Sequence, residues 1–215
     1  GAFVVDRSAE GYRVVGREAT MGFRASETVA VELDGVRVPD EDVLGDPEAG
    51  FACARDALDA GRLGVAAVSL GIAQAALEHS VAYATEREQF ERPIADFGAI
   101  REKLARMATR IALARALAHS VAEDYREEAG AGNPGDGPGP RSRTARVGMA
   151  KAAASEAALW VADEAVQIYG GYGYMRDYPV EKLLRDAKGT EIFEGTNEIL
   201  RELTARALLG EARDG

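Results

Sequence analysis

Helical periodicity over most of the chain is the feature that most constrains its fold. From about Gly50 the sequence is rich in alanine, and apolar residues lie nearly all round the first helical segment, as in a helix buried on several sides. A second segment, from Ile100 to Tyr125, repeats apolar residues at three- and four-residue steps. Further helices are expected from about Thr144 to Tyr169, from Val180 to Ala187 and from Thr196 to Leu209. Long helices of this kind predict a helical bundle.

The first forty residues have a different texture, with short β-branched or alternating runs separated by Gly, Asp and Ser. The runs predicted as strands are Val4-Val5, Tyr12 to Val15, Thr28 to Leu33 and Val36 to Val38. They are too few to bury both faces of a sheet. We therefore predict a partial β domain over residues 1–45 and a helical domain over residues 46–215. Within the latter, residues 130–143 contain Gly and Pro with almost nothing apolar, which predicts a flexible loop.

Composition excludes several classes of protein. Apolar residues make up 47% of the 215 residues and charged residues 29%, a globular balance. A net charge of -10 disfavours nucleic acid as a partner. No stretch looks apolar and uncharged enough to span a membrane, and the first residues lack the pattern of a signal peptide, so we expect a cytoplasmic protein. The single cysteine, Cys53, rules out an intrachain disulfide and a cysteine-cluster metal site, and we expect no metal. It is expected to be a small buried residue rather than a reactive thiol.

Five sequence blocks, in this order, carry a resemblance to a known family. They are Met21 to Ser26 with Val36 to Pro39 and Leu44-Gly45, Leu58 to Arg62, Arg87 to Phe90 with Pro93 and Lys103 to Ala105, Gln167 to Tyr174, and Tyr178 to Glu181 through Arg185 to Ala187 and Ile192 to Thr196. Together they resemble the acyl-CoA dehydrogenase family over nearly the whole chain. The resemblance implies a mainly α fold, in which the family's C-terminal up-down four-helix bundle follows part of its middle β domain.

The resemblance also implies a reaction, the FAD-dependent α,β-dehydrogenation of an acyl-CoA thioester to the trans-2-enoyl-CoA. Glu194 is then the base that removes the α-proton, its backbone amide polarises the thioester carbonyl, and the β-hydrogen leaves as hydride to the flavin N5. Taken alone, Glu194 would be an ordinary acidic residue before a helix, where the dipole favours negative charge. A few relatives carry the base at the position of Gly61, which has no side chain here; Gly61 also reads as a glycine of close helix packing.

Further site residues follow from the same resemblance. Asp59, Arg62 and Gly195 are implied on the substrate side, although Asp59 and Arg62 also read as spaced charges on a helix. The residues implied in binding FAD are Arg87, Gln89, Phe90, Gln167, Gly170 and Gly171 toward the cofactor of a neighbouring subunit, and Thr196 and Glu198 toward that of the same subunit. Gly170-Gly171 also reads as a helix C-cap. The family pattern is broken at Glu91-Arg92, where a Gly usually follows the Phe, and at Gly98, where a Gln is usual.

The implied partners are an acyl-CoA substrate, an electron-transfer flavoprotein and further copies of the chain, as a dimer or tetramer. The Leu-Asp-Ala-Gly-Arg context around Gly61 looks like that of short-chain members, which favours butyryl-like substrates. Two alternatives stay open. One is a non-catalytic helical assembly module that needs an N-terminal half to hold flavin, and the other is an oxidase that uses oxygen directly.

Overall fold

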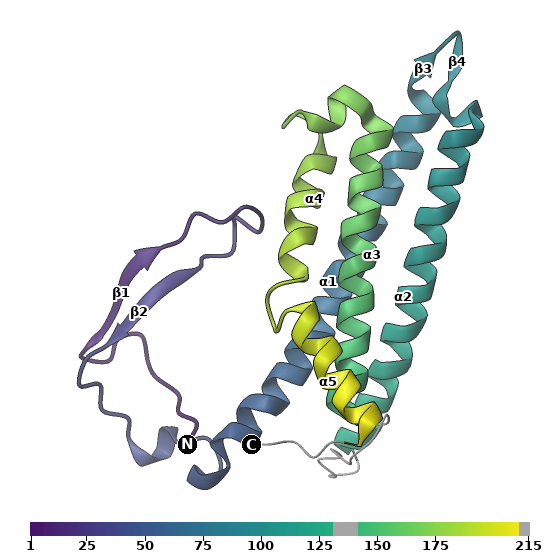
Figure 1. The fold of residues 1–215 in the computed structure, drawn as a ribbon. Coiled ribbons are helices and arrows are strands. Elements are labelled where there is room, and N and C mark those ends of the chain that lie inside the picture. The colour runs from purple at the N-terminus through teal and green to yellow at the C-terminus, as the bar shows by residue number, and fades with distance from the viewer. Residues whose placement is uncertain (131–141, 211–215) are drawn as a thin grey trace. The chain divides into compact units, whose positions relative to one another are not determined.

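The computed structural model describes residues 1–130 and 142–210 (Figure 1). By its internal contacts the chain forms two compact units, residues 1–60 and residues from 61 on, and each is described by itself. The division falls inside a helix, after Ala60. The domain division predicted from the sequence, at residue 45, stays a prediction.

The first unit is built on one antiparallel ribbon. Strand β1 (Tyr12–Arg17) pairs with β2 (Val29–Leu33), from Tyr12 opposite Leu33 to Arg17 opposite Val29, with a register shift between Val14 and Gly16. Two single-turn 3-10 helices, η1 (Asp40–Asp42) and η2 (Pro47–Ala49), follow. Because a ribbon of two strands buries neither face, Val15 and Leu33 stay exposed.

Two of the four predicted strands are confirmed, and the other two are wrong. Val4 donates a single backbone hydrogen bond to Asp42, and Phe3 makes an isolated bridge with Val43, which does not amount to a strand. Residues 36–38 follow Gly35, which has a φ of 63°, and have no ladder partner among the residues described in this unit. A strand needs a neighbour for its backbone groups, and sequence pattern alone does not supply one.

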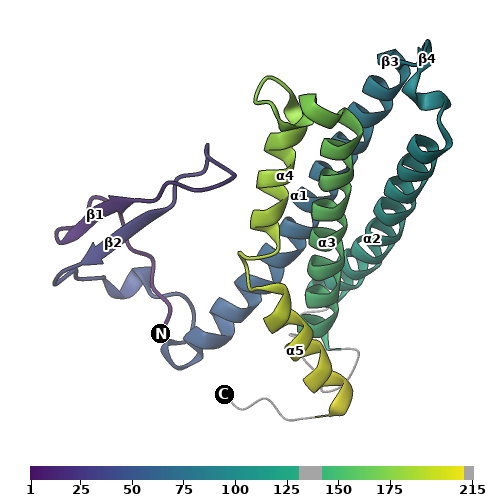
Figure 2. The same ribbon diagram turned by 45° about the horizontal axis from the view of Figure 1, so that its top comes forward.

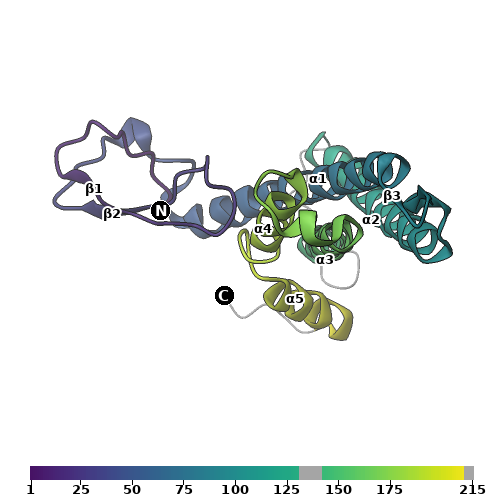
Figure 3. The same ribbon diagram turned by 90° about the horizontal axis from the view of Figure 1, so that it is seen from above.

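The second unit is helical and matches the predicted bundle. Its elements are α1 (Gly50–Glu86), the hairpin β3 (Glu88–Gln89) and β4 (Arg92–Pro93), η3 (Ile94–Asp96), α2 (Gly98–Gly130), α3 (Arg143–Tyr169), η4 (Gly170–Tyr174), α4 (Pro179–Thr190) and α5 (Asn197–Leu209). Helix α3 packs against α2, α4 and α5, as Figures 2 and 3 show from two further sides. The predicted mainly α fold with a helical bundle is confirmed.

Small side chains let these helices approach closely. One buried cluster joins α1, α2 and α3 and consists almost entirely of alanine: Ala66, Leu70, Ala114, Ala118, Ala154 and Ala157. Alanine combines high helix propensity with a short side chain, so an alanine-rich sequence favours both long helices and close packing. The alanine-rich texture of the sequence is therefore the cause of the bundle's tight centre.

Local signals place the helix ends close to where the sequence predicts them. Gly170 ends α3 with a left-handed φ of 58°, which glycine adopts without a steric cost. Pro179 begins α4, and the Thr196 side chain caps α5. Of the predicted loop over residues 130–143, residues 131–141 lie outside the described chain, Gly130 is the last residue of α2 and Arg143 the first of α3.

Two expectations about the start of α1 are corrected. Cys53 is exposed, not buried, and so are Phe51 and Ala54 beside it, because an apolar run in the sequence does not fix which residues of a helix are covered. The stretch Pro47–Glu86 is long and apolar enough, by length and composition, to cross a membrane, so the expectation that no stretch qualifies is wrong. One such helix is weak support for a membrane span, since a core helix passes the same test, and 44% of its most apolar window is buried within the protein.

Candidate functional site

The connection between α4 and α5 has an unusual backbone, as does the hairpin turn at Phe90 and Glu91. Glu194 has a φ of 56° and Gly195 a φ of 95°, so two consecutive residues adopt left-handed conformations. Glycine does so freely, but a glutamate with a Cβ does so at a cost of roughly 1–3 kcal/mol. Such strain persists only where the surroundings hold the residue in place, which makes Glu194 a candidate functional residue.

Two buried cations from two different helices hold this turn. The Arg62 Nε, on α1, donates a hydrogen bond of 3.0 Å to the Glu194 carbonyl. The Lys151 Nζ, on α3, donates one of 2.9 Å to the next carbonyl, that of Gly195. Both side chains are buried, Lys151 completely. Charged donors form stronger hydrogen bonds than neutral ones, so these contacts stabilise the left-handed turn.

The Glu194 carboxylate lies directly against Gly61 of α1. A Cβ placed on Gly61 would come within 2.7 Å of the Glu194 Oε2 and within 3.0 Å of its Cδ. These distances are shorter than a real Cβ contact, so the carboxylate occupies space that only a glycine leaves open. Since α1 and the α4–α5 connection are far apart in the sequence, the bundle brings the two residues together. A half-buried carboxylate held this way can act as a general base.

Lys151 belongs to this site, and the sequence prediction missed it. Its Nζ also donates to the Asn197 Oδ1 at 3.0 Å, and the Asn197 Nδ2 donates to the Ser155 Oγ at 3.0 Å. Burial lowers the pKa of Lys151 to about 8, and nearby Arg62 lowers it further against the opposing pull of acidic neighbours. The sequence did contain a signal for this residue, a single lysine among alanines in the third helix. Lysine is almost never fully buried without partners, so a lysine at such a position indicates a polar site.

A second group of predicted residues lines a pocket of about 420 Å³ near the other end of the bundle. The pocket walls are Tyr83, Arg87, Gln89, Ile94, Ile168, Tyr169, Gly170, Gly171, Tyr172 and Met175. Tyr83 stacks on Tyr169 with ring centroids 3.9 Å apart, and burial raises the pKa of both phenols, so both stay protonated at neutral pH. The structure thus brings together four of the predicted cofactor residues, Arg87, Gln89, Gly170 and Gly171.

The donors of this pocket fit an anionic, aromatic cofactor such as FAD. The Arg87 guanidinium lies 5.3 Å from the centroid of the Tyr172 ring and is a suitable partner for a pyrophosphate. At Gly170 and Gly171 nothing lies within 4 Å of where a Cβ would be, so the backbone faces open space that a ligand can fill. Aromatic side chains around the rim offer stacking surfaces for a planar ring.

The remaining predicted residues lie in four other places. Phe90 is at the tip of the β3–β4 hairpin, 86% exposed with a φ of 52°, and Gln167 is exposed in the last turn of α3. Thr196 and Glu198 begin α5, beside the Glu194 turn in sequence. The pKa of Glu198 is lowered by hydrogen bonds from its own backbone and from the Thr196 side chain. Asp59, in the first-unit part of α1, is fully buried.

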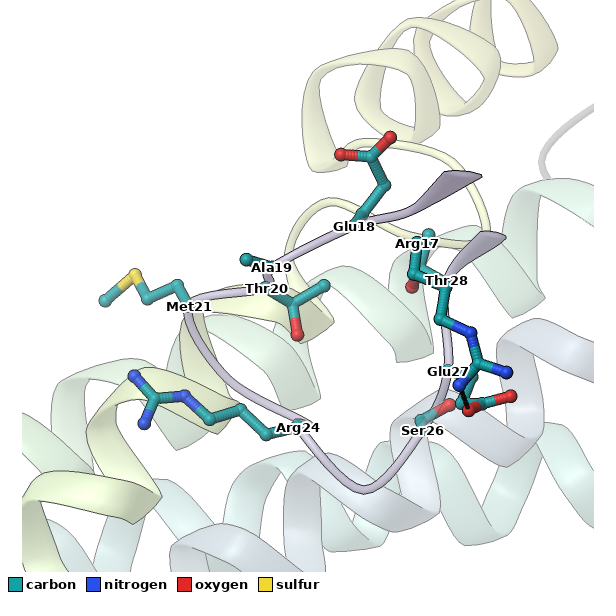
Figure 4. A pocket seen from close by; sticks show the side chains of 9 residues that line it. All are labelled: Arg17, Glu18, Ala19, Thr20, Met21, Arg24, Ser26, Glu27 and Thr28. Carbon is teal, nitrogen blue, oxygen red and sulfur yellow. Dashed lines mark hydrogen bonds and ion pairs between the residues drawn. The ribbon is translucent and has the colours of Figure 1, made fainter. Parts of the chain in front are cut away.

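The first unit holds a larger hollow that lacks comparable chemistry. A space of about 620 Å³ lies at the end of the β1–β2 ribbon, lined by residues 17–21, 24 and 26–28. Figure 4 shows the Glu18 side chain pointing away from those of Met21 and Arg24, and only Arg17 and Glu27 are drawn as an ion pair. Convergent polar groups mark a binding site, so this hollow is not a candidate. Among residues 1–130 and 142–210, no cluster of three or more potential metal-ligating side chains occurs.

Comparison with known proteins places the chain among acyl-CoA dehydrogenases. The family model described as "Acyl-CoA dehydrogenase, C-terminal domain" matches residues 48–209. An acyl-CoA dehydrogenase of Bacillus subtilis is 46% identical over 97% of this chain and 52% of its own length. An acryloyl-CoA reductase (NADH) of Anaerotignum propionicum is 42% identical over 97% of this chain and 50% of its own.

A solved structure agrees with these sequence relatives. The butyryl-CoA dehydrogenase of Megasphaera elsdenii superposes with a TM-score of 0.88 at 42% identity, covering 96% of this chain and 51% of that one. The chain thus spans about half the length of the relatives that it matches. The match confirms the predicted bundle preceded by a partial β unit.

Proposed function

The chain belongs to the acyl-CoA dehydrogenase family, and from this premise we propose that it carries out the FAD-dependent dehydrogenation of an acyl-CoA thioester to the trans-2-enoyl-CoA. The relatives include an acyl-CoA dehydrogenase and an acryloyl-CoA reductase, which supports oxidation or reduction of an acyl-CoA. The observation that carries the proposal is the left-handed turn at Glu194, held by Arg62 and Lys151 and facing Gly61.

Glu194 is the proposed base. The α-proton of a thioester is weakly acidic, so its removal requires a positioned carboxylate and stabilisation of the enolate that forms. In the proposed step the Glu194 carboxylate takes the α-proton while its own amide donates to the thioester carbonyl. Among the described residues, the backbone hydrogen bonds of this connection include none from the Glu194 amide, which agrees with a donor kept for substrate.

We assign the FAD contacts to Arg87, Gln89, Gly170 and Gly171, with Phe90 and Gln167 beside them and Thr196 and Glu198 at the start of α5. Bound FAD supplies the acceptor for the hydride that leaves the β-carbon. By resemblance, the first group serves the cofactor of a neighbouring copy, so a dimer or tetramer is part of the proposal. An electron-transfer flavoprotein is the proposed electron acceptor, and the cytoplasm is the proposed location.

Substrate contacts are assigned to Asp59, Arg62 and Gly195. The hydrogen bond of Arg62 to the Glu194 carbonyl supports a part for Arg62 in holding the base. We propose a short-chain substrate such as butyryl-CoA, because the segment Leu58 to Arg62 resembles that of short-chain members of the family.

The second candidate is a non-catalytic assembly module of the same family. The chain spans about half the length of its relatives. The resemblance implies that the other half of a family member supplies further walls for flavin and acyl chain. On this alternative the chain assembles but does not hold FAD by itself.

The proposal is tested by the visible spectrum of the purified chain with FAD, before and after adding butyryl-CoA without oxygen. A protein-bound flavin band that bleaches is the expected result. Glu194→Gln should keep the band and lose the bleaching. Glu202→Gln, which removes an exposed carboxylate on α5, should bleach like the wild type. Rapid bleaching of Glu194→Gln would remove Glu194 from the mechanism.

A chain that binds no flavin is tested further as a chimera. The N-terminal half of the Megasphaera elsdenii enzyme, joined to this chain in place of its own C-terminal half, supplies the part that the chain does not span. Bleaching of the chimera, and its loss with Glu194→Gln, would support the proposed chemistry and a need for the second half. A flavin-loaded chimera that does not bleach would favour the non-catalytic module.

A further inference from the structure

Lys151 is the largest fully buried side chain in the described protein, and its position on α3 demands an explanation. Burying an ammonium removes it from water at a high cost unless its hydrogen bonds are replaced. Its neighbours along α3, Ala150 and Ala152, are small and apolar and offer no partner side chain. The partners come instead from the α4–α5 connection and the first residue of α5.

The two acceptors of Lys151 both lie directly after Glu194 in the chain. One is the carbonyl of Gly195, the residue after Glu194, and the other is the side chain of Asn197. Asn197 is itself buried and fixed by Ser155, one turn further along α3. The backbone N–H of Asn197 also donates to the Glu191 carbonyl at 3.1 Å, which closes the connection into a compact loop. Lys151 therefore ties the C-terminal side of this loop to α3, and the bond from Asn197 to Glu191 joins that side to the start of the loop.

Arg62 alone does not account for the geometry at Glu194. It holds the Glu194 carbonyl, which fixes one peptide plane, whereas the left-handed conformation at Gly195 orients the next one. Lys151 holds that next carbonyl. With both planes fixed by charged donors from different helices, neither residue can relax to a right-handed conformation without breaking a buried, charge-assisted hydrogen bond.

We infer that Lys151 is a positioning residue for the reaction, one whose ammonium fixes the Gly195 carbonyl and thereby holds the Glu194 carboxylate beside Gly61. Lys151 acts through the backbone of the turn and does not touch substrate. The inference rests on the proposed function for its catalytic meaning, but its structural half, the fixing of the 191–197 loop, is measurable without activity.

Backbone hydrogen exchange tests the structural half on the full chain. Lys151→Met keeps an unbranched side chain of similar length and removes the donor. The expected result is exchange that is about tenfold faster at Asn197 and its neighbours in the loop, with the α2 and α3 amides unchanged. Lys103→Met is the matched control. It makes the same substitution at a lysine that is paired away from the loop, with Glu164 on α3. It should leave loop exchange at the wild-type rate.

Kinetics test the catalytic half on the flavin-loaded protein. Lys151→Met should lower the bleaching rate at saturating butyryl-CoA about tenfold, since misplacing a catalytic group by less than an ångström has an effect of this order. The butyryl-CoA concentration for half-maximal rate should stay near the wild-type value. The readout is the first-order rate constant of bleaching, because a loss of folded protein lowers the amplitude of bleaching and leaves that rate constant unchanged. A wild-type chain that is never bleached counts against the proposed function, and loop exchange then decides the Lys151 inference by itself.

Three results would overturn the inference. The first is loop exchange in Lys151→Met equal to that of the wild type. The second is exchange that rises equally along α2 and α3, which would assign Lys151 to the stability of the bundle. Lys151→Gln, which keeps a donor without the charge, is the second variant if the methionine variant does not fold. The third result would be that neither Lys151→Met nor Lys151→Gln folds while Lys103→Met does.

Discussion

Replacing Gly61 by alanine should separate stability from catalysis. The added Cβ would lie 2.7 Å from the Glu194 Oε2, and Cβ atoms essentially never come within 3.0 Å of a neighbour and make ordinary contact only from 3.4 Å. The Oε2 must therefore retreat by about 0.3–0.7 Å. Because this atom is the far end of a flexible side chain, the movement costs little stability, but it displaces the proposed base.

The expected magnitudes follow from this displacement. A misplacement of about 1 Å can lower a rate about 100-fold, so a shift of about half that size should lower it roughly tenfold. Alanine meanwhile raises helix propensity over glycine by roughly 1 kcal/mol in a helix interior. We expect Gly61→Ala to be as stable as the wild type or more stable by up to about 1 kcal/mol, and to reduce flavin about ten times more slowly.

Gly64→Ala is the control on the same helix. Nothing lies within 4 Å of a Cβ at Gly64, so this variant should gain the same helix propensity and keep the wild-type rate. Urea unfolding gives the two stabilities, and stopped-flow bleaching at saturating butyryl-CoA in the flavin-loaded protein gives the rates. Equal rates for the two variants would refute the reasoning, because the contact between Gly61 and Glu194 would then have no effect on catalysis.

Three further predictions concern charge and capping. The pKa of Lys151 is about 8 in the folded protein against its ordinary 10.5, so between these two pH values the unfolded chain binds more protons than the folded one. The stability of the wild type relative to Lys151→Met should therefore rise with pH across this window by up to roughly 3 kcal/mol. Urea unfolding from pH 7 to 10.5 measures this difference. A flat difference would contradict the folded-state pKa. Thr196→Ala should lower the free energy of unfolding by about 1 kcal/mol, because it removes the side-chain acceptor for the first turn of α5. Calorimetry measures this loss. The control is Thr109→Ala, which removes an exposed hydroxyl that donates to a carbonyl within α2. Arg87→Met should weaken FAD binding about tenfold or more, as measured by fluorescence titration. Arg126→Met, at an exposed position of α2, should leave the affinity unchanged. Equal affinities of the two variants would remove Arg87 from the cofactor site.

Some features could be predicted because their causes are local. The bounds of α3 and α5 agree with the sequence within about one residue, since apolar spacing, Gly170 and Thr196 act within a turn or two of the chain. The same holds for the linear segment Phe193 to Thr196, which identified Glu194 from its order among the family blocks. Four of the predicted cofactor residues share a pocket because both of their blocks lie at ends of α1 and α3.

Other features depended on contacts that no local pattern encodes. The strands expected at Val4-Val5 and Val36 to Val38 do not form, because a strand exists only where a neighbour pairs with it. Cys53 lies in an apolar run yet is exposed, because burial depends on which side of the helix meets the rest of the protein. Lys151 was overlooked because nothing nearby in sequence explains a charge among alanines.

By itself, then, the sequence determined the helices, their ends and the identity of the proposed base. Tertiary structure alone decided how that base is held: Arg62 lies 132 residues from Glu194 along the chain and Lys151 lies 44 residues from Gly195, yet both donate to adjacent carbonyls of one turn. The physical reason is the distance along the chain over which each effect acts. Propensity and capping act within a few residues, whereas a buried cation takes whichever acceptors helix packing brings to it.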